Sequence, residues 1–520
     1  MKGKLRLLLT VAAAVSIVAG AWAALWHDRP GADDAAPIAR PPRIRPDYSG
    51  SVIPPNIAPL NFAVRERGTR FFVRIRAEAG DAIEILSRSP QITIPPRRWR
   101  ALVGANRGKD LLFDVYADVD GRWRRYRTIV NRIAQEDVDG YVVYRLAGPI
   151  HTMGRKIGIY QRDLTTYRES VVLDGMSLEH ACVNCHSFAN NDPNRMFIGV
   201  RSRTFGTATV FVDDGNVEKI GDKFGYTAWH PSGRVAAYSV NMADQFFHAA
   251  GAEVRDVVDL DAALAYYAIE ARSVKMVPRA SDKRRLETYP TWSPDGTYLY
   301  YCSAPLLWTD RNAVPPARYA EVRYDLMRIR YDVDADAWGE PETVLSAEET
   351  GLSILMPRIS PDGRFLLFCM CRYGCFPVYQ PSSDLYMMDL ATAKYAKLPI
   401  NSEFSESWHC WSSNSRWIAF SSRRRGGTFT RCYISFVDKT GKAHKPFILP
   451  QSDPEFYDSF LKTVSVPELI TGPVPIRGKS LARAARSENV VVVDGITRPT
   501  QPAFSEPWQQ AEPYRQAPAR

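Results

Sequence analysis

The chain has 520 residues and a formal net charge of +10; hydrophobic residues make up 45% of it and charged residues 24%. These fractions are typical of a globular protein, so they exclude a wholly disordered chain and a protein with many membrane spans. The basic residues are spread along the chain, and no Lys/Arg block has the pattern of a nucleic-acid-binding stripe. This distribution argues against nucleic-acid binding and leaves acidic partners or an anionic surface as the expectation from charge.

Residues 1–26 have the pattern of an export signal. Three basic residues within the first six precede an apolar run at 7–20, and Ala-Trp-Ala at 21–23 matches an A-x-A-type cleavage site. Residues 7–26 are also long enough to span a bilayer as a helix, so an uncleaved anchor is the alternative. Both alternatives place the rest of the chain in the periplasm or cell envelope.

Two proline-rich segments are predicted to remain outside packed domains. Residues 27–56 are expected to be an extended linker, because seven prolines fall between residues 28 and 55. Residues 497–520 carry five prolines and are expected to be a disordered tail. Residues 451–496 are assigned to a C-terminal extension of the preceding domain.

Residues 57–150 show the period-two pattern of β-strands. In residues 70–76 the apolar positions 71, 73 and 75 alternate with Arg74 and Arg76, and Asp120-Gly121 marks a hairpin turn. Short strands at close spacing without a helical period predict a β-sandwich. No catalytic motif occurs in this segment, so a spacer or packing domain is expected.

A degenerate repeat follows within residues 191–450. Each copy has a short strand, a turn of the Pro-Asp-Gly type and a second strand of alternating aromatic residues, and a further hairpin pattern comes after it. The four clearest copies lie at residues 226–239, 289–301, 357–368 and 410–420. Four strands recurring every 50–65 residues or so are typical of β-propeller blades.

These motifs resemble the TolB-like β-propeller family, whose repeat reads roughly P-x-W-S-P-D-G. The match is good at 289–303 and 356–368, and weaker at 407–422, where Ser413-Asn414-Ser415 replaces Pro-Asp-Gly. Residues 191–202 are similar to a decayed first blade. Five blades can be counted, whereas the resemblance implies six. The predicted fold is therefore all-β, with an N-terminal β-sandwich followed by a five- or six-bladed TolB-like propeller.

The chemistry of the chain is expected in the connector at 151–190, which contains Cys182-Val183-Asn184-Cys185-His186. C-x-x-C-H is the attachment signal for c-type haem: Cys182 and Cys185 would form thioethers, and His186 would be the proximal iron ligand. The alternatives are a disulfide beside an incidental histidine, a thioredoxin-like site without its βαβ context, and a zinc site without a second ligand pair. A short helix at 177–185 is expected around the motif.

Propeller geometry ranks the candidates for the sixth iron ligand, because the turn of each repeat and the start of its first strand are expected on opposite faces. His248 follows a second strand and His409 begins a first strand, so both are predicted on the face of the motif. His248 is the preferred distal ligand and His409 the second choice. A methionine or an open position is also consistent with the sequence, whereas His230 is expected to cap a turn on the far face.

Three consecutive arginines, Arg423, Arg424 and Arg425, are predicted on the same face. Guanidinium groups there would pair with haem propionates or dock an acidic redox partner, and an ordinary solvated loop is the alternative. Six further cysteines have no pairing that the sequence determines: Cys302, Cys369, Cys371, Cys375, Cys410 and Cys432.

The sequence as a whole predicts an exported protein with one covalent haem c, more an electron-transfer or binding protein than a catalyst. One-electron transfer to a partner in the cell envelope is the preferred function. The alternatives are a non-enzymatic binding or haem-sensor module and a haem-dependent peroxidase-like enzyme. Neither nucleic acid nor a membrane partner, beyond the N-terminal segment, is expected.

Overall fold

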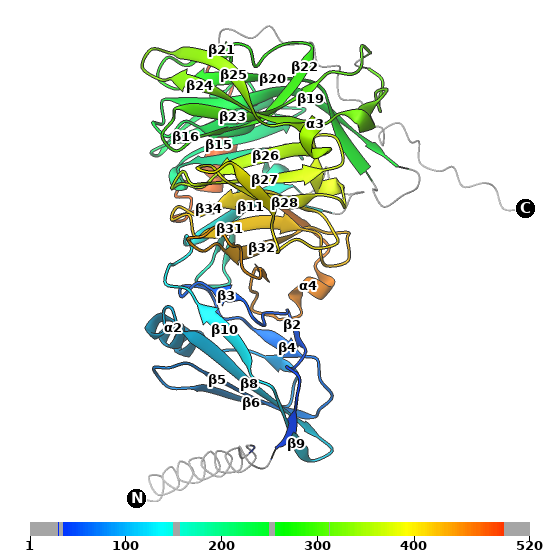
Figure 1. Cartoon of the computed structure of the whole chain (residues 1–520). Coiled ribbons are helices and arrows are strands. Elements are labelled where there is room, and N and C mark those ends of the chain that lie inside the picture. Colours follow the sequence, from blue (N-terminus) through cyan, green and yellow to red (C-terminus); the bar gives the residue numbers. More distant parts are fainter. Residues whose placement is uncertain (1–29, 31–34, 149–156, 249–254, 311, 493–520) are drawn as a thin grey trace, which may run out of the picture.

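A computed structural model describes residues 30, 35–148, 157–248, 255–310 and 312–492. The described chain is almost entirely β, with a smaller N-terminal domain next to a larger array of stacked sheets (Figure 1). The predicted export signal and the predicted C-terminal tail lie outside the described residues. Within the described ranges, no helix is both long and apolar enough to span a bilayer.

The N-terminal domain has two sheets and a helix. The larger sheet contains β1 (Ala36–Ile38), β3 (Val52–Ile53), β5 (Arg70–Arg76), β6 (Ile83–Ser87), β8 (Asp110–Val119), β9 (Arg122–Tyr126) and β10 (Ile129–Ile133). The smaller sheet contains β2 (Ile44–Arg45), β4 (Phe62–Val64) and β7 (Gln91–Ile92), and α2 spans Pro96–Ala105. The expected strand at 70–76 and the hairpin turn at 120–121 are confirmed.

Aromatic side chains join the two sheets and the helix into one core. The ring of Phe113, on β8, lies 6.1 Å from that of Phe62, on β4, and 6.5 Å from that of Trp99, on α2. Residues 35–56 also belong to this domain, because they supply β1, β2 and β3 and bury Tyr48 and Ile53. The expectation of an unpacked linker is therefore wrong for residues 35–56. Strand pairing and the burial of apolar side chains stabilise this segment, although its prolines cannot donate backbone hydrogen bonds.

Six antiparallel units of four strands each form the rest of the fold, and they are numbered here in chain order. A single parallel pair, Ala262 with Leu286, joins units 3 and 4 into one eight-stranded sheet. Unit 1 has β34 (Thr463–Ile470), β11 (Tyr141–Ala147), β12 (Gly158–Asp163) and β13 (Glu169–Asp174); unit 2 has β14 (Cys182–Ala189), β15 (Asp192–Ser202), β16 (Gly206–Asp213) and β17 (Asn216–Ile220). Unit 3 has β18 (Gly225–Trp229), β19 (Val235–Phe247), β20 (Arg255–Ala268) and β21 (Ser273–Met276); unit 4 has β22 (Arg285–Trp292), β23 (Tyr298–Pro305), β24 (Asp325–Asp332) and β25 (Ala337–Leu345).

The last two units complete the set. Unit 5 has β26 (Ser353–Ile359), β27 (Phe365–Cys371), β28 (Asp384–Asp389) and β29 (Lys394–Lys397); unit 6 has β30 (Glu406–Trp411), β31 (Trp417–Ser422), β32 (Arg431–Phe436) and β33 (Phe447–Ile448). Short helices lie between strands: η2 (Gly175–Leu178), η3 (Tyr319–Glu321), α3 (Ala347–Thr350), η4 (Pro377–Tyr379), α4 (Phe456–Ser459) and α5 (Gly478–Arg486).

The first strands named for each unit contact one another in a closed cycle: β34 with β14, then β18, β22, β26, β30 and β34 again. This is the arrangement of a β-propeller, and these six are its inner strands. Unit 1 takes its inner strand from the C-terminal side of the chain, where β34 pairs with β11. The boundaries predicted at 150, 191 and 450 are therefore corrected, because residues 141–174 and 463–470 belong to the ring.

The repeat motif forms the turn between the first and second strands of a unit. In unit 4 the Ser293 hydroxyl donates to Asp295 Oδ1 at 2.5 Å, and Gly296, at φ +74°, donates its N–H to the Ser293 carbonyl. Such a positive φ explains the glycine of the motif. In unit 3 His230 Nδ1 accepts from the Ser232 N–H at 3.1 Å, so His230 caps its turn as the sequence predicts.

The departure from the repeat in unit 6 has a structural reason. The N–H and hydroxyl of Ser413 both donate to the Asp139 carboxylate, at 2.9 and 2.5 Å, and Asn414 Nδ2 donates to the Asp137 carbonyl. The turn therefore holds the segment that joins the N-terminal domain to β11. A Pro-Asp pair at these positions would remove the Ser413 donors.

Each inner strand has a β-bulge at the same place. The six residues at the bulges are non-glycine residues with φ between 44° and 56°: Cys185, Tyr226, Tyr289, Met356, Trp408 and Val466. A left-handed backbone costs such residues about 1–2 kcal/mol, so its sixfold recurrence marks a constraint of the ring. Because the bulge falls at the same position of each inner strand, residues of different units can be matched by their distance in sequence from it.

Candidate functional site

The C-x-x-C-H motif lies on β14, the inner strand of unit 2. The expected helix at 177–185 is wrong: only the short η2 precedes the motif, and Cys182–Ala189 is a strand. Strand pairing favours this outcome, because Val183 packs into the core while Cys182 lies opposite Arg201 of β15. The motif is therefore part of the wall around the propeller axis.

The two thiols of the motif differ from the other cysteines in exposure. All eight cysteines are free, but only Cys182 and Cys185 retain partial exposure, whereas the other six are buried. Arg201 Nη2 donates to Cys182 Sγ at 3.5 Å, and Asn184 Nδ2 approaches the same sulfur at 3.6 Å. The motif thus contains the two cysteines of the chain that keep part of their surface exposed.

Three cations lower the pKa of Cys182. Burial raises the pKa of the Cys182 thiol, but the charges of Arg201, Arg145 and Lys223 outweigh it and lower the pKa to about 7. These residues come from β15, from β11 and from the link between β17 and β18. No local motif marks them, so they are functional candidates that sequence reasoning missed.

Cys185 is the bulge residue of β14, with φ +51°. Gly199 of β15 is the partner of the preceding residue, Asn184, and an added Cβ there would lie 3.2 Å from the Asn184 carbonyl oxygen and 3.6 Å from Cys185 Cβ. A side chain at this position would therefore crowd Asn184, within the motif, while it would only touch Cys185.

His186 is 3% exposed, and neither ring nitrogen has a hydrogen bond to the described residues. Burial lowers the pKa of His186 to about 4, and the backbone of Val143 and Val466 in unit 1 opposes this shift only in part. The ring is therefore neutral at pH 7 and lies toward unit 1. A neutral imidazole with unbonded nitrogens has the electronic form that an iron ligand needs.

Aromatic bulge residues fill the ring centre beside the motif. The ring of Tyr226, from unit 3, lies 4.3 Å from that of Tyr289, from unit 4, and 5.9 Å from that of Trp408, from unit 6. Side chains from units on opposite sides meet only at the axis, so these rings close it. The Cys185 thiol is also among the groups that raise the pKa of Tyr226, after burial and Asp259, which places the cluster near the motif.

The two predicted distal histidines lie in different surroundings. His248 follows the end of β19. The β19–β20 hairpin continues beyond Ser239, the last residue of β19 that pairs with β18. His248 Nε2 lies 3.9 Å from Asp256 Oδ2. His409 is buried, with Nε2 3.1 Å from the Leu367 carbonyl oxygen and Nδ1 3.7 Å from Cys369 Sγ. Neither pattern of contacts includes the motif strand.

The three predicted propionate ligands follow β31 in unit 6. Arg424 forms an ion pair with Glu406 at 3.1 Å, and Arg425 with Asp458 at 2.7 Å. Arg423 donates to the Thr428 carbonyl oxygen. Two of the three guanidinium groups therefore already have carboxylate partners within the chain.

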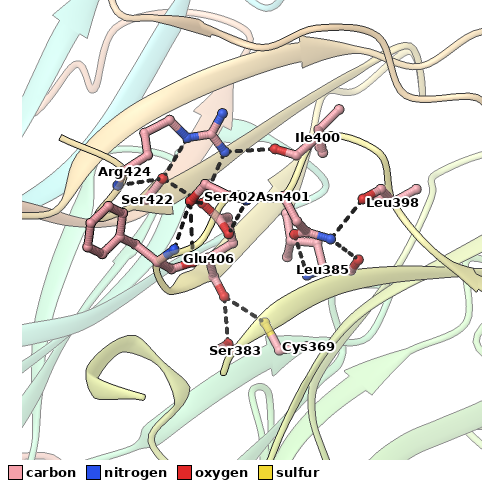
Figure 2. A network of polar contacts seen from close by, with 11 residues as sticks. Cys369, Ser383, Leu385, Leu398, Ile400, Asn401, Ser402, Glu406, Ser422 and Arg424 are labelled. Carbon is pink, nitrogen blue, oxygen red and sulfur yellow. Dashed lines mark hydrogen bonds and ion pairs between the residues drawn. The ribbon is translucent and has the colours of Figure 1, made fainter. Parts of the chain in front are cut away.

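The Arg424–Glu406 pair belongs to a polar network inside unit 6 (Figure 2). Glu406 is fully buried, and its Oε1 accepts from the hydroxyls of Ser402 and Ser422, each at 2.7 Å. Arg424 also donates to the Ile400 carbonyl oxygen at 2.8 Å. Such a satisfied network stabilises the fold, and this assigns Arg424 a structural role.

Two other features do not compete with the motif as sites. Among the described residues no three His, Cys, Asp or Glu side chains gather in a manner suited to a metal ion. A cavity of about 460 Å³ in the N-terminal domain is lined by Arg76, Lys109 and Arg132, among others, and these three pair with Asp114, Glu78 and Asp110.

Comparison with known proteins finds structural similarity at low sequence identity. No family model and no curated protein matches the sequence. A chain of a nidogen/laminin complex is similar over 64% of this chain and 99% of that one, with 7% identity and a TM-score of 0.38. The tricorn protease (69% and 34% covered, 14% identity, TM-score 0.33) and prolyl oligopeptidase B from Galerina marginata (65% and 42% covered, 11% identity, TM-score 0.34) are similar in part. These neighbours are β-propeller-like proteins, and the fold itself is established by the strand pairing.

Proposed function

We propose that this protein is an exported, TolB-like propeller with one covalent haem c on Cys182 and Cys185, and that it transfers single electrons to an acidic partner in the cell envelope. The observation that carries the proposal is the C-x-x-C-H motif, in which two partly exposed cysteines precede a buried histidine whose ring nitrogens have no hydrogen bond of ordinary geometry to the described residues. The export pattern of residues 1–26 supports it, because c-type haem is attached outside the cytoplasm.

The surroundings of the motif suit the amphipathic shape of a haem. Tyr226, Tyr289 and Trp408 offer an aromatic surface, and Arg145, Arg201 and Lys223 offer positive charge for carboxylates. Cys182 and Cys185 would anchor the group, and the aromatic cluster would keep water from the axis. The bound haem would supply a one-electron couple between ferric and ferrous iron.

His186 must move before it can bind iron. Both of its ring nitrogens are inaccessible, and the ring lies toward the backbone of Val143 and Val466. Turning the ring would therefore break its packing against unit 1. The proposal therefore requires a different His186 rotamer in the haem-bound protein.

Covalent haem is tested by producing the full chain with haem-attachment machinery and staining it for haem after denaturing electrophoresis. We expect haem to remain on the wild type and on Cys375→Ser, whose thiol is buried in unit 5. Cys182→Ser should lose one thioether and Cys182→Ser/Cys185→Ser all covalent haem. A wild type that runs without haem refutes the proposal.

One observation favours a second function, a dithiol redox site. The Cys182 thiol has a pKa of about 7 and lies three residues from a second accessible thiol, as in redox-active C-x-x-C pairs. This function predicts a reversible Cys182–Cys185 disulfide, detected by thiol trapping, in protein that carries no haem.

A further inference from the structure

The hairpin of β19 and β20 is longer than the corresponding hairpin of any other unit. β19 continues eight residues past Ser239, the partner of the residue before the bulge of β18, whereas the second strands of the other units end at most three residues past the equivalent position. A β-bulge at Leu260 of β20 bends the hairpin on its way, and Trp308 Nε1 donates to the Leu260 carbonyl oxygen at 3.3 Å. Residues 243–247 and 255–259, beyond this bulge, are called the lid here.

The hairpin leaves the ring beside the motif strand. β18, its inner strand, contacts β14. At Gly225 of β18 an added Cβ would lie 2.9 Å from Asn241 Oδ1, so the root of the hairpin packs against that strand. Gly225 precedes the bulge of β18 as Asn184 precedes the bulge of β14. The lid therefore extends from the end of the axis at which the motif strand begins.

The far part of the lid is anchored on unit 5. Cys375, in the segment between β27 and β28, donates its thiol to the Val257 carbonyl oxygen at 3.4 Å. Arg255 donates to the Tyr379 hydroxyl, and its guanidinium carbon lies 4.0 Å from the centre of that ring. These contacts carry the lid from unit 3 past unit 4 to unit 5.

The segment that holds the lid lies on the propeller axis. Tyr289 donates its hydroxyl to the Cys375 carbonyl oxygen at 2.8 Å, and the ring of Phe376 lies 5.5 Å from that of Trp408. Tyr289 and Trp408 are the bulge residues of units 4 and 6, the position that Cys185 has in unit 2. A lid fixed to this segment therefore crosses the axis on the side where the motif strand begins.

We propose that the lid controls the entry of a planar group of the size of a haem to Cys182 and Cys185, and that it must release unit 5 before the group can enter. The inference rests on the proposed function for the identity of that group. The lid is held by a thiol hydrogen bond, an arginine–tyrosine contact and an edge-to-face pair of Phe246 with Tyr319. Each such contact is weak by itself, so the lid can open while the ring stays folded.

The test is alkylation of the haem-free full chain by pyrene maleimide, a planar reagent, with the modified cysteines mapped by mass spectrometry. In Arg255→Met, which removes the anchor on Tyr379, we expect Cys182 and Cys185 to react about tenfold faster than in the wild type.

Arg328→Met is the matched control. Arg328 lies 4.6 Å from the centre of the Tyr298 ring, so the variant removes the same kind of contact, but between β24 and β23 of unit 4. Its motif cysteines should react at the wild-type rate.

Three buried cysteines report on the lid and on the ring in the same experiment. Cys375 should become reactive in Arg255→Met, because its thiol contacts the lid. Cys369 and Cys410, on β27 and β30, should stay unmodified, because they are buried within the ring. This pattern separates an opened lid from an unfolded protein.

The inference is overturned if Arg255→Met leaves the motif cysteines at the wild-type rate, with or without a reactive Cys375. It is also overturned if Cys369 and Cys410 react along with them, or if Arg328→Met reproduces the effect. If Arg255→Met yields no folded protein, Tyr379→Phe decides, and it should accelerate the same reactions about threefold because only the hydroxyl is lost. Failure of the proposed function is distinguishable, because then the wild type carries no covalent haem, whereas alkylation is measured without haem.

Discussion

His186 and His409 occupy the same position in two inner strands, one residue after the left-handed bulge, yet only His409 has partners on its ring nitrogens. Each ring lies toward the preceding unit: His409 toward Leu367 and Met356, and His186 toward Val143 and Val466. The position therefore accepts a purely structural histidine. The missing hydrogen bonds are what distinguish His186.

This pair gives a matched test of iron ligation. In haem-loaded protein, His186→Ala should retain covalent haem but lose the low-spin ferric spectrum, because the iron would lose an axial imidazole. His409→Ala should keep the spectrum and lower the free energy of unfolding by about 2 kcal/mol, since the buried Leu367 carbonyl would lose its donor. A spectral change in His409→Ala alone would instead make His409 an iron ligand.

The distal ligand is tested at His248. If a loop movement brings this residue from its place near Asp256 to the iron, His248→Ala should convert the ferric spectrum toward high spin and open the iron to added ligands. His230→Ala should leave the spectrum unchanged, because His230 caps a turn. A wild type that is already high-spin would contradict distal ligation by His248 and favour the sensor or peroxidase-like alternatives.

The Glu406 network should make Arg424 important for stability (Figure 2). Arg424→Met leaves a fully buried carboxylate without its cation, so we expect the free energy of unfolding to fall by about 3 kcal/mol. Arg425→Met breaks a partly exposed pair and should cost less than about 1 kcal/mol. Denaturant unfolding measures both, and Glu406→Gln added to Arg424→Met should recover part of the loss.

Glu287 should make stability depend on pH. Its side chain is buried between Ser303 and Arg285, and burial raises its pKa to about 8, against the opposing charge of Arg285. The folded state therefore retains a proton that an unfolded chain releases near pH 4.3. The stabilisation from this group is complete below about pH 4.3. As the pH rises from there to about 8, the stabilisation falls by up to about 1.4 kcal/mol per pH unit.

The measurement is the thermal midpoint of the wild type and of Glu287→Gln across this pH range. The variant should gain stability relative to the wild type as pH rises toward 8, and the difference should then stay constant. A difference that does not change with pH would show that Glu287 has an ordinary pKa in the folded protein.

The sequence by itself determined the features that depend on neighbouring residues. The Ser-Pro-Asp-Gly turns and the alternation in the strands after them are local, because the turn hydrogen bonds join residues at most five apart, such as Ser293, Asp295 and Tyr298. The all-β propeller, the capping role of His230 and the C-x-x-C-H motif could therefore be predicted. A helix was expected around the motif, whereas the motif lies on a strand. The spacing of its cysteines and histidine does not specify the backbone conformation.

Only the tertiary structure decided which distant segments meet. Pairing of β34 with β11 closes the ring across more than 300 residues, and no local pattern distinguishes β34 from an ordinary strand. The same holds for the charges that lower the pKa of Cys182, since Arg145 and Lys223 lie outside unit 2. Arg424 was predicted as a ligand contact because a run of arginines is visible in sequence, whereas its buried partner, Glu406, becomes apparent only when unit 6 is folded.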